Sequence, residues 1–206
     1  MDNNELWNSI LNTLEIEANS IKKLKDTLSQ KAVLDILKLI AACKGRILVS
    51  GCGTSGAAAK KIAHSLCCVE RPACFLNPSD AVHGGLGLLQ KDDILILVSK
   101  GGNTTELVNL ISACKTKKAK LICVTENADS ILGKEANIVL KIKVEKEPCP
   151  FNMLATASTL AVIATFDAIC ITLMSYTNYT KEQFAIIHPG GSVGARLLQG
   201  EGSANK

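Results

Sequence analysis

The sequence predicts an α/β protein built on a doubly wound, five-stranded parallel sheet with helices on both faces, in three layers. Short aliphatic runs alternate with segments of helical period along most of the chain, which is typical of this class. The clearest run, residues 94–98, contains only isoleucine, leucine and valine, as expected of a central strand covered on both faces. Two runs lead directly into glycine-rich turns, at residues 51–56 and 99–105, and a helical period follows each turn. Ligands bind at the carboxyl ends of the strands in such sheets, so these turns mark the expected site.

Composition limits the possible functions. At 206 residues, without a linker rich in proline, glycine or serine, the chain has room for one substantial domain. The net charge of +4 is modest, the lysines are scattered and only 3% of residues are aromatic, so we expect no nucleic-acid surface. The nine cysteines have no C-x-x-C spacing, which favours buried thiols in a reducing cytosol over a zinc site or a disulfide framework. The polar start M-D-N-N-E-L-W is unlike a signal peptide, so we expect a cytoplasmic protein.

Two helices are expected ahead of the first strand, within residues 1–44. Apolar residues at mostly helical spacing extend over residues 5–28 and again over residues 33–40, and Gly45 is a stop signal. The first apolar stripe precedes every strand, so we expect it to cover another subunit rather than the sheet of its own chain.

The strands and the helices between them follow in order. Strands are expected at residues 46–50, 73–76, 94–98, 119–125 and 136–142. Helices are expected over residues 57–68, briefly at Ala81, from Leu107 onward, near residues 130–134 and, as the last one, from Ser192.

Residues 154–176 form a long apolar segment whose length alone would permit a membrane span. Asp167 interrupts this segment, and an aspartate in mid-span costs roughly 2.5–3.5 kcal/mol on insertion scales. No basic cluster or aromatic belt flanks the segment. We therefore expect a helix buried on most sides, partly at a subunit interface, with Asp167 as a hydrogen-bonded structural carboxylate and no membrane contact.

The first turn, residues 51–56, has the form G-x-G-x-x-G between a strand and a helix. A dinucleotide site also needs an acidic residue at the end of the second strand, to hold the ribose hydroxyls, and the chain has an asparagine and a proline there. Because the fingerprint is incomplete, we expect a tight turn at Gly53 that presents Thr54 and Ser55 to a small ligand.

The second turn places small polar side chains at the start of a helix. Its members are Ser99, Lys100, Gly101, Gly102, Asn103, Thr104 and Thr105. Backbone N–H groups at such a helix start, with hydroxyls around them, can bind a phosphate or another anion. Asn103 and Glu106 have the spacing of an N-cap and its capping-box partner, so Glu106 has either that structural role or a catalytic one.

Three further residues are candidates because of their positions. Glu147 precedes a proline at the carboxyl end of the fifth strand, which directs its segment toward the ligand crevice. His83 lies just ahead of two glycines, and His188 is followed by a rigid P-G-G break. A lone histidine is often structural and a charged loop residue is often only solvated, so both interpretations stay open here.

Four motifs together resemble those of the sugar isomerase (SIS) domain family, and in particular its arabinose 5-phosphate isomerase branch. These motifs are G-x-G-x-S at residues 51–55, S-x-x-G-x-T-x-E at 99–106, K-E-x-C-P at 146–150 and H-P-G-G-x-x-G at 188–194. The resemblance covers residues 5–199 and implies a flavodoxin-like SIS fold. It divides the single domain 1–206 into N-terminal helices at 1–44, a core at 45–199 and a disordered tail at 200–206. Family members often carry CBS domains after H-P-G-G, so the chain resembles a single-domain form.

The resemblance also implies roles for individual residues. The residues that match active-site positions of the family are Glu106, Glu147, His188 and His83. Those expected to bind the substrate and its phosphate are Gly53, Thr54, Ser55, Ser99, Lys100, Gly102, Asn103, Thr104 and Thr105. Thr54 stands where the family usually has an active-site lysine, and Lys100 stands where an uncharged residue is usual. Lys100 is therefore expected to supply the missing positive charge.

The expected reaction interconverts D-ribulose 5-phosphate and D-arabinose 5-phosphate through an enediol, without a metal or a cofactor. Glu147 is the expected base, with a pKa raised by burial, Glu106 is its partner carboxylate, and His188 is a proton shuttle. The alternatives are another SIS phosphosugar isomerase, acting on a hexulose or heptulose phosphate, and a non-catalytic sugar-phosphate sensor. Similar proteins form tetramers with shared active sites, so we expect a homotetramer without nucleic-acid or membrane partners.

Overall fold

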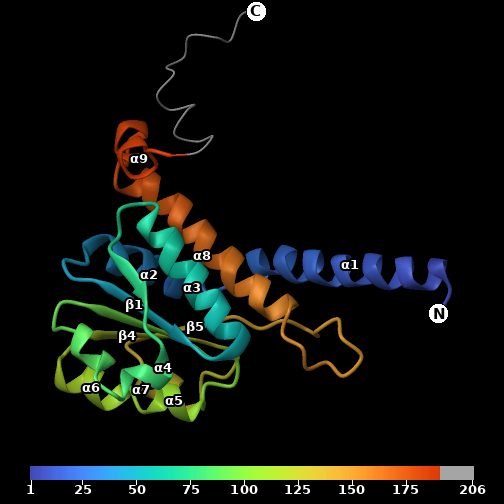
Figure 1. Cartoon of the computed structure of the whole chain (residues 1–206), viewed down its shortest axis with the longest axis horizontal. Coiled ribbons are helices and arrows are strands. Elements are labelled where there is room, and N and C mark those ends of the chain that lie inside the picture. The colour runs from blue at the N-terminus through green and yellow to red at the C-terminus, as the bar shows by residue number, and fades with distance from the viewer. Residues whose placement is uncertain (191–206) are drawn as a thin grey trace, which may run out of the picture.

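The computed structural model describes residues 1–190 and confirms the α/β class. Five strands, all parallel, form one sheet in the order β2-β1-β3-β4-β5 (Figure 1). The strands are β1 (Ile47–Gly51), β2 (Ala73–Phe75), β3 (Ile94–Val98), β4 (Lys120–Thr125) and β5 (Ile138–Lys141). The strand order reverses between β1 and β3, which is the switch point of a doubly wound sheet.

The sheet buries a separate apolar core on each face, because side chains alternate along a strand. On β1, for example, Val49 belongs to one core and Leu48 to the other. The first core lies under α2 (Gln30–Ala42), α3 (Gly53–Cys67) and α8 (Ala157–Tyr176). The second lies under α4 (Pro78–Ala81), α5 (Thr105–Val108), α6 (Ile111–Thr116) and α7 (Ile131–Glu135), with a 3-10 turn, η1, at Gly85–Leu88. Helices thus cover both faces and give the expected three layers (Figure 1).

The central strand β3 is buried along its whole length, as its aliphatic run predicts. It pairs with β1 and β4 in a register that sets Val98 beside Gly51 on one side and Val124 on the other. The carboxyl ends of these three strands therefore reach the same edge of the sheet, and the residues after them are close in space.

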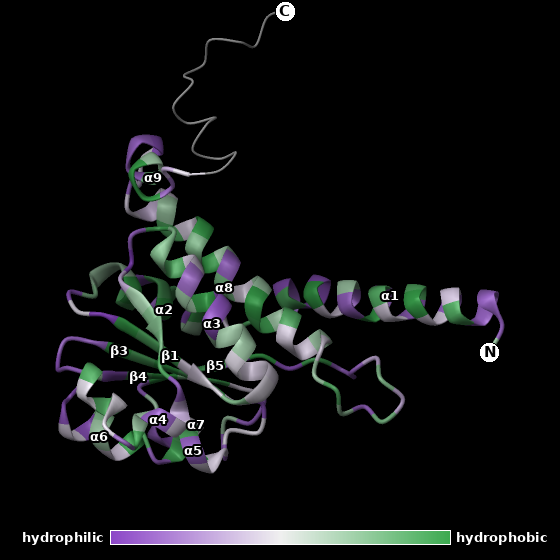
Figure 2. Cartoon of the chain, viewed as in Figure 1, coloured by the Kyte–Doolittle hydropathy of each residue, from purple (hydrophilic) through white to green (hydrophobic). Residues whose placement is uncertain are grey.

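The N-terminal segment forms the two expected helices, α1 (Asn3–Thr27) and α2. Asp2 and Glu5 begin α1 with a reciprocal capping box. α1 extends away from the sheet (Figure 1; Figure 2). Leu24 is the one residue of this helix that is buried. Its outer turns expose the apolar side chains of Leu6, Trp7, Ile10, Leu11 and Leu14. Within residues 1–190, the chain leaves this stripe uncovered.

α8 is long and apolar enough to cross a membrane by length and composition, and half of that window is buried within the described structure. It packs against α1 and α3, but Ile171 and Tyr176 are exposed, so the helix is less enclosed than expected. Asp167 accepts hydrogen bonds from Lys61 and Ser65 of α3, in agreement with the expected structural role.

Two helical segments differ from the expectation. The helix expected from Leu107 is divided into α5 and α6. After α8, the chain forms α9 (Lys181–Ile187), which the apolar pattern did not predict and which begins with a capping box between Thr180 and Gln183. The last helix expected from Ser192, and the tail expected at 200–206, lie outside the described residues.

All nine cysteines are free. Cys114, Cys123 and Cys170 are buried, and burial raises the pKa of the Cys123 thiol to about 12. Cys67 is exposed, so the expectation of buried thiols holds for only part of the set.

Candidate active site

The loop between β3 and α5 is organised around the hydroxyl of Ser99. Ser99 Oγ lies 2.8 Å from Thr104 Oγ1, with which it shares a hydrogen bond, and it accepts a second one from the backbone N–H of Gly102 at 3.1 Å. Gly102 has a φ of +70°, and a Cβ at this position would collide with Ser130, so glycine is required here. The loop therefore holds two hydroxyls together at the edge of the sheet, as expected of an anion site.

The capping box that the spacing of Asn103 and Glu106 suggested does not form. The N-cap of α5 is Thr104, which makes no side-chain cap because its hydroxyl bonds to Ser99. The Asn103 side chain instead accepts a hydrogen bond from the backbone N–H of Ile131, 2.9 Å away at the start of α7. Asn103 thus joins the β3–α5 loop to α7, and Glu106 does not have the structural role that its spacing suggested.

Glu147 lies in the loop between β5 and α8, and its carboxylate is buried at the N-terminus of α8. Oε2 accepts hydrogen bonds from the backbone N–H groups of Thr156 at 3.0 Å and Ser158 at 3.4 Å. Oε1 accepts one from the Lys100 ammonium at 2.7 Å. The positive end of a helix dipole favours an anion at this place, so both the helix and the lysine hold the carboxylate ionised.

The pKa of Glu147 lies below its ordinary value, which corrects the expectation that burial would raise it. Burial does raise the pKa, but hydrogen bonds from Lys100, Ser158 and Thr156, together with the positive charge of Lys100, outweigh that effect. The burial could be foreseen from the sequence, whereas the pairing with a lysine 47 positions away could not.

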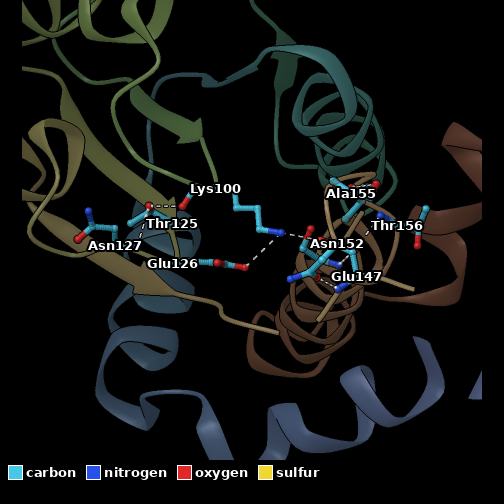
Figure 3. A network of polar contacts seen from close by, with 10 residues as sticks. Lys100, Thr125, Glu126, Asn127, Glu147, Asn152, Ala155 and Thr156 are labelled. Atoms are coloured by element: carbon cyan, nitrogen blue, oxygen red, sulfur yellow. Dashed lines mark hydrogen bonds and ion pairs between the residues drawn. The ribbon is translucent and has the colours of Figure 1, made fainter. Parts of the chain in front are cut away.

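The Lys100 side chain extends between two carboxylates (Figure 3). Its Nζ is 2.7 Å from Glu147 Oε1 and 3.8 Å from Glu126 Oε1. Glu126 Oε1 is sealed from solvent and has no hydrogen-bond partner, and the same is true of Thr156 Oγ1. Sequence reasoning missed Glu126, although it is the first residue after β4 and the parallel register places it at the same edge as Lys100.

Two hollows flank the turn after β1. A cavity of about 30 Å³, lined by Ser55, Lys100, Glu126 and Ser158 among others, has room for little more than one water molecule. A larger crevice of about 410 Å³ lies on the side of α4 and α5. Its polar and glycine lining includes Gly51, Gly53, Lys60, Asn77, Ser79 and Glu106. Glu106 lines the larger crevice, whereas Glu147 adjoins the small cavity through Lys100 and Ser158, which line it and bond to the Glu147 carboxylate.

The two candidate histidines do not join Glu147 within one chain. His83 is exposed between α4 and η1. His188 follows α9, where its ring stacks on Phe184 at a centroid distance of 3.9 Å and its Nδ1 lies 3.0 Å from the Phe184 carbonyl oxygen. Glu147 binds the start of α8, whereas α9 and His188 follow the end of α8 (Figure 1). The 20 residues of α8 span about 30 Å, so the helix separates His188 from Glu147.

The remaining substrate-site candidates are on the two turns. Thr54 is exposed and Ser55 half-buried in the first turn of α3. Thr105 is exposed at the first residue of α5.

The chain matches the family model of the SIS domain over residues 39–180. A Haemophilus influenzae protein named a probable arabinose 5-phosphate isomerase is 39% identical over 186 residues, which are 90% of this chain and 55% of the relative. The arabinose 5-phosphate isomerase KpsF of Escherichia coli O6:H1 is 36% identical over 193 residues, 94% of this chain and 59% of the relative. The chain therefore spans somewhat more than half the length of these curated relatives.

Solved structures of sugar-phosphate proteins are also similar to this chain. A Listeria monocytogenes protein, named provisionally as a sugar-phosphate isomerase, has a TM-score of 0.91 at 61% identity, with 92% of this chain and 100% of that chain covered. The Escherichia coli CFT073 protein c3406, in complex with arabinose 5-phosphate, has a TM-score of 0.88 at 27% identity, with coverage of 92% and 100%. Because the family model spans most of the sequence and the sheet agrees with these structures, the chain belongs to the SIS domain family.

Proposed function

We propose that the chain is a phosphosugar isomerase that interconverts D-arabinose 5-phosphate and D-ribulose 5-phosphate. The observation that carries the proposal is the buried carboxylate of Glu147, bonded to Lys100 of a loop whose Ser99 and Thr104 hydroxyls are arranged for a phosphate. The names of the curated relatives and the arabinose 5-phosphate complex of the Escherichia coli neighbour support a phosphorylated five-carbon sugar.

The reaction moves a hydrogen between adjacent carbons. A base removes the proton from C2 of the open-chain aldose, and the electrons of that bond form the C1–C2 double bond of an enediol while the C1 oxygen gains a proton. A proton then returns to C1 as the C2 hydroxyl loses its own, which leaves the ketose. Protons and electrons balance within the sugar. Glu147 is the proposed base, Glu106 the partner carboxylate and His188 the group that moves hydroxyl protons.

The phosphate binds at the two turns. The hydroxyls proposed to hold it are those of Ser55, Ser99, Thr104 and Thr105, with Gly53, Gly102 and Asn103 shaping the turns and Thr54 facing the sugar. Lys100 supplies the positive charge that a lysine at position 54 provides in similar proteins. If Lys100→Ala left the affinity for sugar phosphate unchanged, Lys100 would not have this role.

The complete site is proposed to be shared between copies of the chain in a cytoplasmic homotetramer. The distance between His188 and Glu147 supports this, because one chain does not bring them together. The uncovered apolar stripe on α1, at Leu6, Ile10 and Leu14, supports an interface between copies. His83, which is exposed after α4, is proposed to enter a neighbouring site in the same way.

A substrate panel tests the function. The purified protein is incubated in D₂O with pentose, hexulose and heptulose phosphates, and NMR follows both isomerisation and deuterium at the carbon next to the carbonyl. Arabinose 5-phosphate is expected to be the best substrate. Because Thr54 replaces the usual lysine, a hexulose or heptulose phosphate is the second candidate, and its preference would correct the substrate. Calorimetric binding of a sugar phosphate without any deuterium exchange would instead identify a sensor.

A further inference from the structure

Lys100 occupies the oxygen that the proposed base needs. Oε2 of Glu147 is committed to the backbone N–H groups of Thr156 and Ser158, which it caps at the start of α8. Oε1 is therefore the oxygen left for a substrate proton, and it is bonded to the Lys100 ammonium at 2.7 Å. A carboxylate whose two oxygens are both bonded to donors is a weak base. Isomerisation by Glu147 requires that Lys100 leave Oε1.

The surroundings of Lys100 allow a movement of its side chain alone. The Lys100 carbonyl accepts hydrogen bonds from the Glu126 backbone N–H at 2.9 Å and from Thr125 Oγ1 at 3.0 Å, so its backbone is fixed to the end of β4. The side chain is 41% exposed, whereas that of Glu147 is fully buried. The lysine is therefore the mobile partner of this ion pair.

Glu126 offers Lys100 a second position. Its Oε1 is 3.8 Å from Nζ, is sealed from solvent and has no hydrogen-bond partner, an arrangement that costs free energy until the oxygen is paired. A shift of Nζ by about 1 Å would bring the two atoms within hydrogen-bond distance. The cavity beside them, about 30 Å³, cannot hold a sugar while Lys100 stays where it is.

We propose that Lys100 is a two-position latch, bonded to Glu147 in the free enzyme and to Glu126 and the substrate phosphate in the complex. Glu126 acts through Lys100 and is therefore a positioning residue for the base. The inference rests on the proposed isomerase function and adds to it a carboxylate that the sequence motifs do not contain. The latch couples phosphate binding to the activity of the base, because the arriving phosphate draws the Lys100 ammonium away from Glu147.

The charges around Glu147 make its titration a direct measure of the latch. In the part of the chain that the structure describes, Lys100 is the charged group in contact with it, and Glu126 lies on the other side of that lysine. The contacts from the start of α8 are the uncharged Thr156 and Ser158, and α3 presents the uncharged Ser55 to the cavity that Lys100 lines. Departure of Lys100 removes a contact that lowers the pKa of Glu147, so the carboxyl titrates at higher pH.

The first experiment compares two pH–rate profiles, because kcat/KM reports the free enzyme and kcat reports the complex. In the wild type, the acidic limb of kcat should lie at higher pH than that of kcat/KM. Glu126→Gln keeps the shape of the side chain but removes the charge that receives Lys100. In this variant we expect the acidic limbs of kcat and kcat/KM to lie at nearly the same pH. We also expect kcat to fall on the order of tenfold, which is the effect of about one pKa unit.

Matched variants separate the latch from other effects. Lys100→Met removes the latch, so the acidic limb of kcat/KM should rise toward that of kcat, and adding Glu126→Gln should then change nothing further. Glu135→Gln, which removes a carboxylate paired with Lys115 on another face, is the control and should behave as the wild type. Wild-type kcat and an unchanged separation of the limbs in Glu126→Gln would overturn the proposal. The proposal would also be overturned if the fold-loss of kcat in the Lys100→Met/Glu126→Gln double variant equalled the product of the two single fold-losses, because Glu126 would then act independently of Lys100.

A titration without turnover distinguishes failure of the latch from failure of the isomerase function. Carboxyl ¹³C NMR of glutamate-labelled protein, with the Glu147 signal assigned from Glu147→Gln, follows the pKa with and without saturating inorganic phosphate. The latch predicts a rise on phosphate binding in the wild type and a smaller rise in Glu126→Gln. A pKa that phosphate does not move overturns the latch, even if the substrate panel shows isomerisation. A panel with no turnover rejects the function, while a phosphate-dependent rise would still support the latch.

Discussion

Glu147 combines two roles in one side chain. One carboxylate oxygen caps α8 through Thr156 and Ser158, and the other bonds to Lys100. The pKa of its carboxyl is below the unfolded value of about 4.3. The ionised form therefore contributes stability that is fully present above about pH 4.3 and is lost as the pH falls through the lower folded pKa. The same contacts that stabilise the fold restrain the proposed base, so at this residue stability and the proposed catalytic role oppose each other.

Glu147→Gln tests both roles. We expect kcat to fall by roughly 10²–10⁴, because the amide cannot take the substrate proton. We also expect a loss of about 1–3 kcal/mol in the free energy of unfolding at pH 7, since Lys100 loses its buried partner, and a smaller difference below about pH 4. Steady-state kinetics and urea unfolding at the two pH values measure these effects.

Glu145→Gln is the matched control, because Glu145 belongs to the same loop but is exposed and pairs with Lys23 of α1. Glu145→Gln should have the kcat and the free energy of unfolding of the wild type. Near wild-type turnover of Glu147→Gln would remove Glu147 from the mechanism, whatever its effect on stability.

The elements of the sheet show which features the sequence determines. The strands could be placed because each apolar run is short and is bounded by polar, charged, glycine or proline residues, and β3 at Ile94–Val98 matches its run throughout. The division between α5 and α6 could not be foreseen, because Leu107, Leu110 and Ile111 fit one continuous helical period. The Asn103 contact was missed for a similar reason, since a local cap and a tertiary bond use the same amide oxygen.

Asn103→Ala tests whether the bond to α7 positions the β3–α5 loop, which is proposed to bind the phosphate. Loss of the 2.9 Å hydrogen bond from Ile131 should cost about 1 kcal/mol of stability. Because the loop is held away from the reacting carbons, we expect KM to rise several-fold and kcat to change little. Asn127→Ala removes an asparagine whose side chain bonds locally, accepting a hydrogen bond from the backbone N–H of Asp129 at 3.1 Å, and should leave KM unchanged. Equal KM values in the two variants would show that Asn103 does not position the loop.

At the scale of the whole molecule, the sequence pointed to candidate site residues that one chain does not bring together. Ser99, Lys100 and Glu147 meet at the edge of the sheet, as the parallel topology requires. His188 is carried to the far end of α8 because the intervening helix is rigid and about 30 Å long. Motif matching gives no distance between residues, so it could not reveal this separation. The proposed site, shared between copies of the chain, would reconcile the motif with the geometry.

Subunit complementation tests the shared site. Glu147→Gln and His188→Ala proteins, each expected to be inactive alone, are unfolded, mixed in equal amounts and refolded together. If the histidine of one copy serves the carboxylate of another, some sites in the mixed assemblies contain both wild-type residues, and part of the wild-type activity should return. Mixing Glu147→Gln with the double variant Glu147→Gln/His188→Ala is the control, because no mixed site then contains a wild-type Glu147. An inactive first mixture, with mixed assemblies confirmed by native mass spectrometry, would show that His188 does not act across subunits.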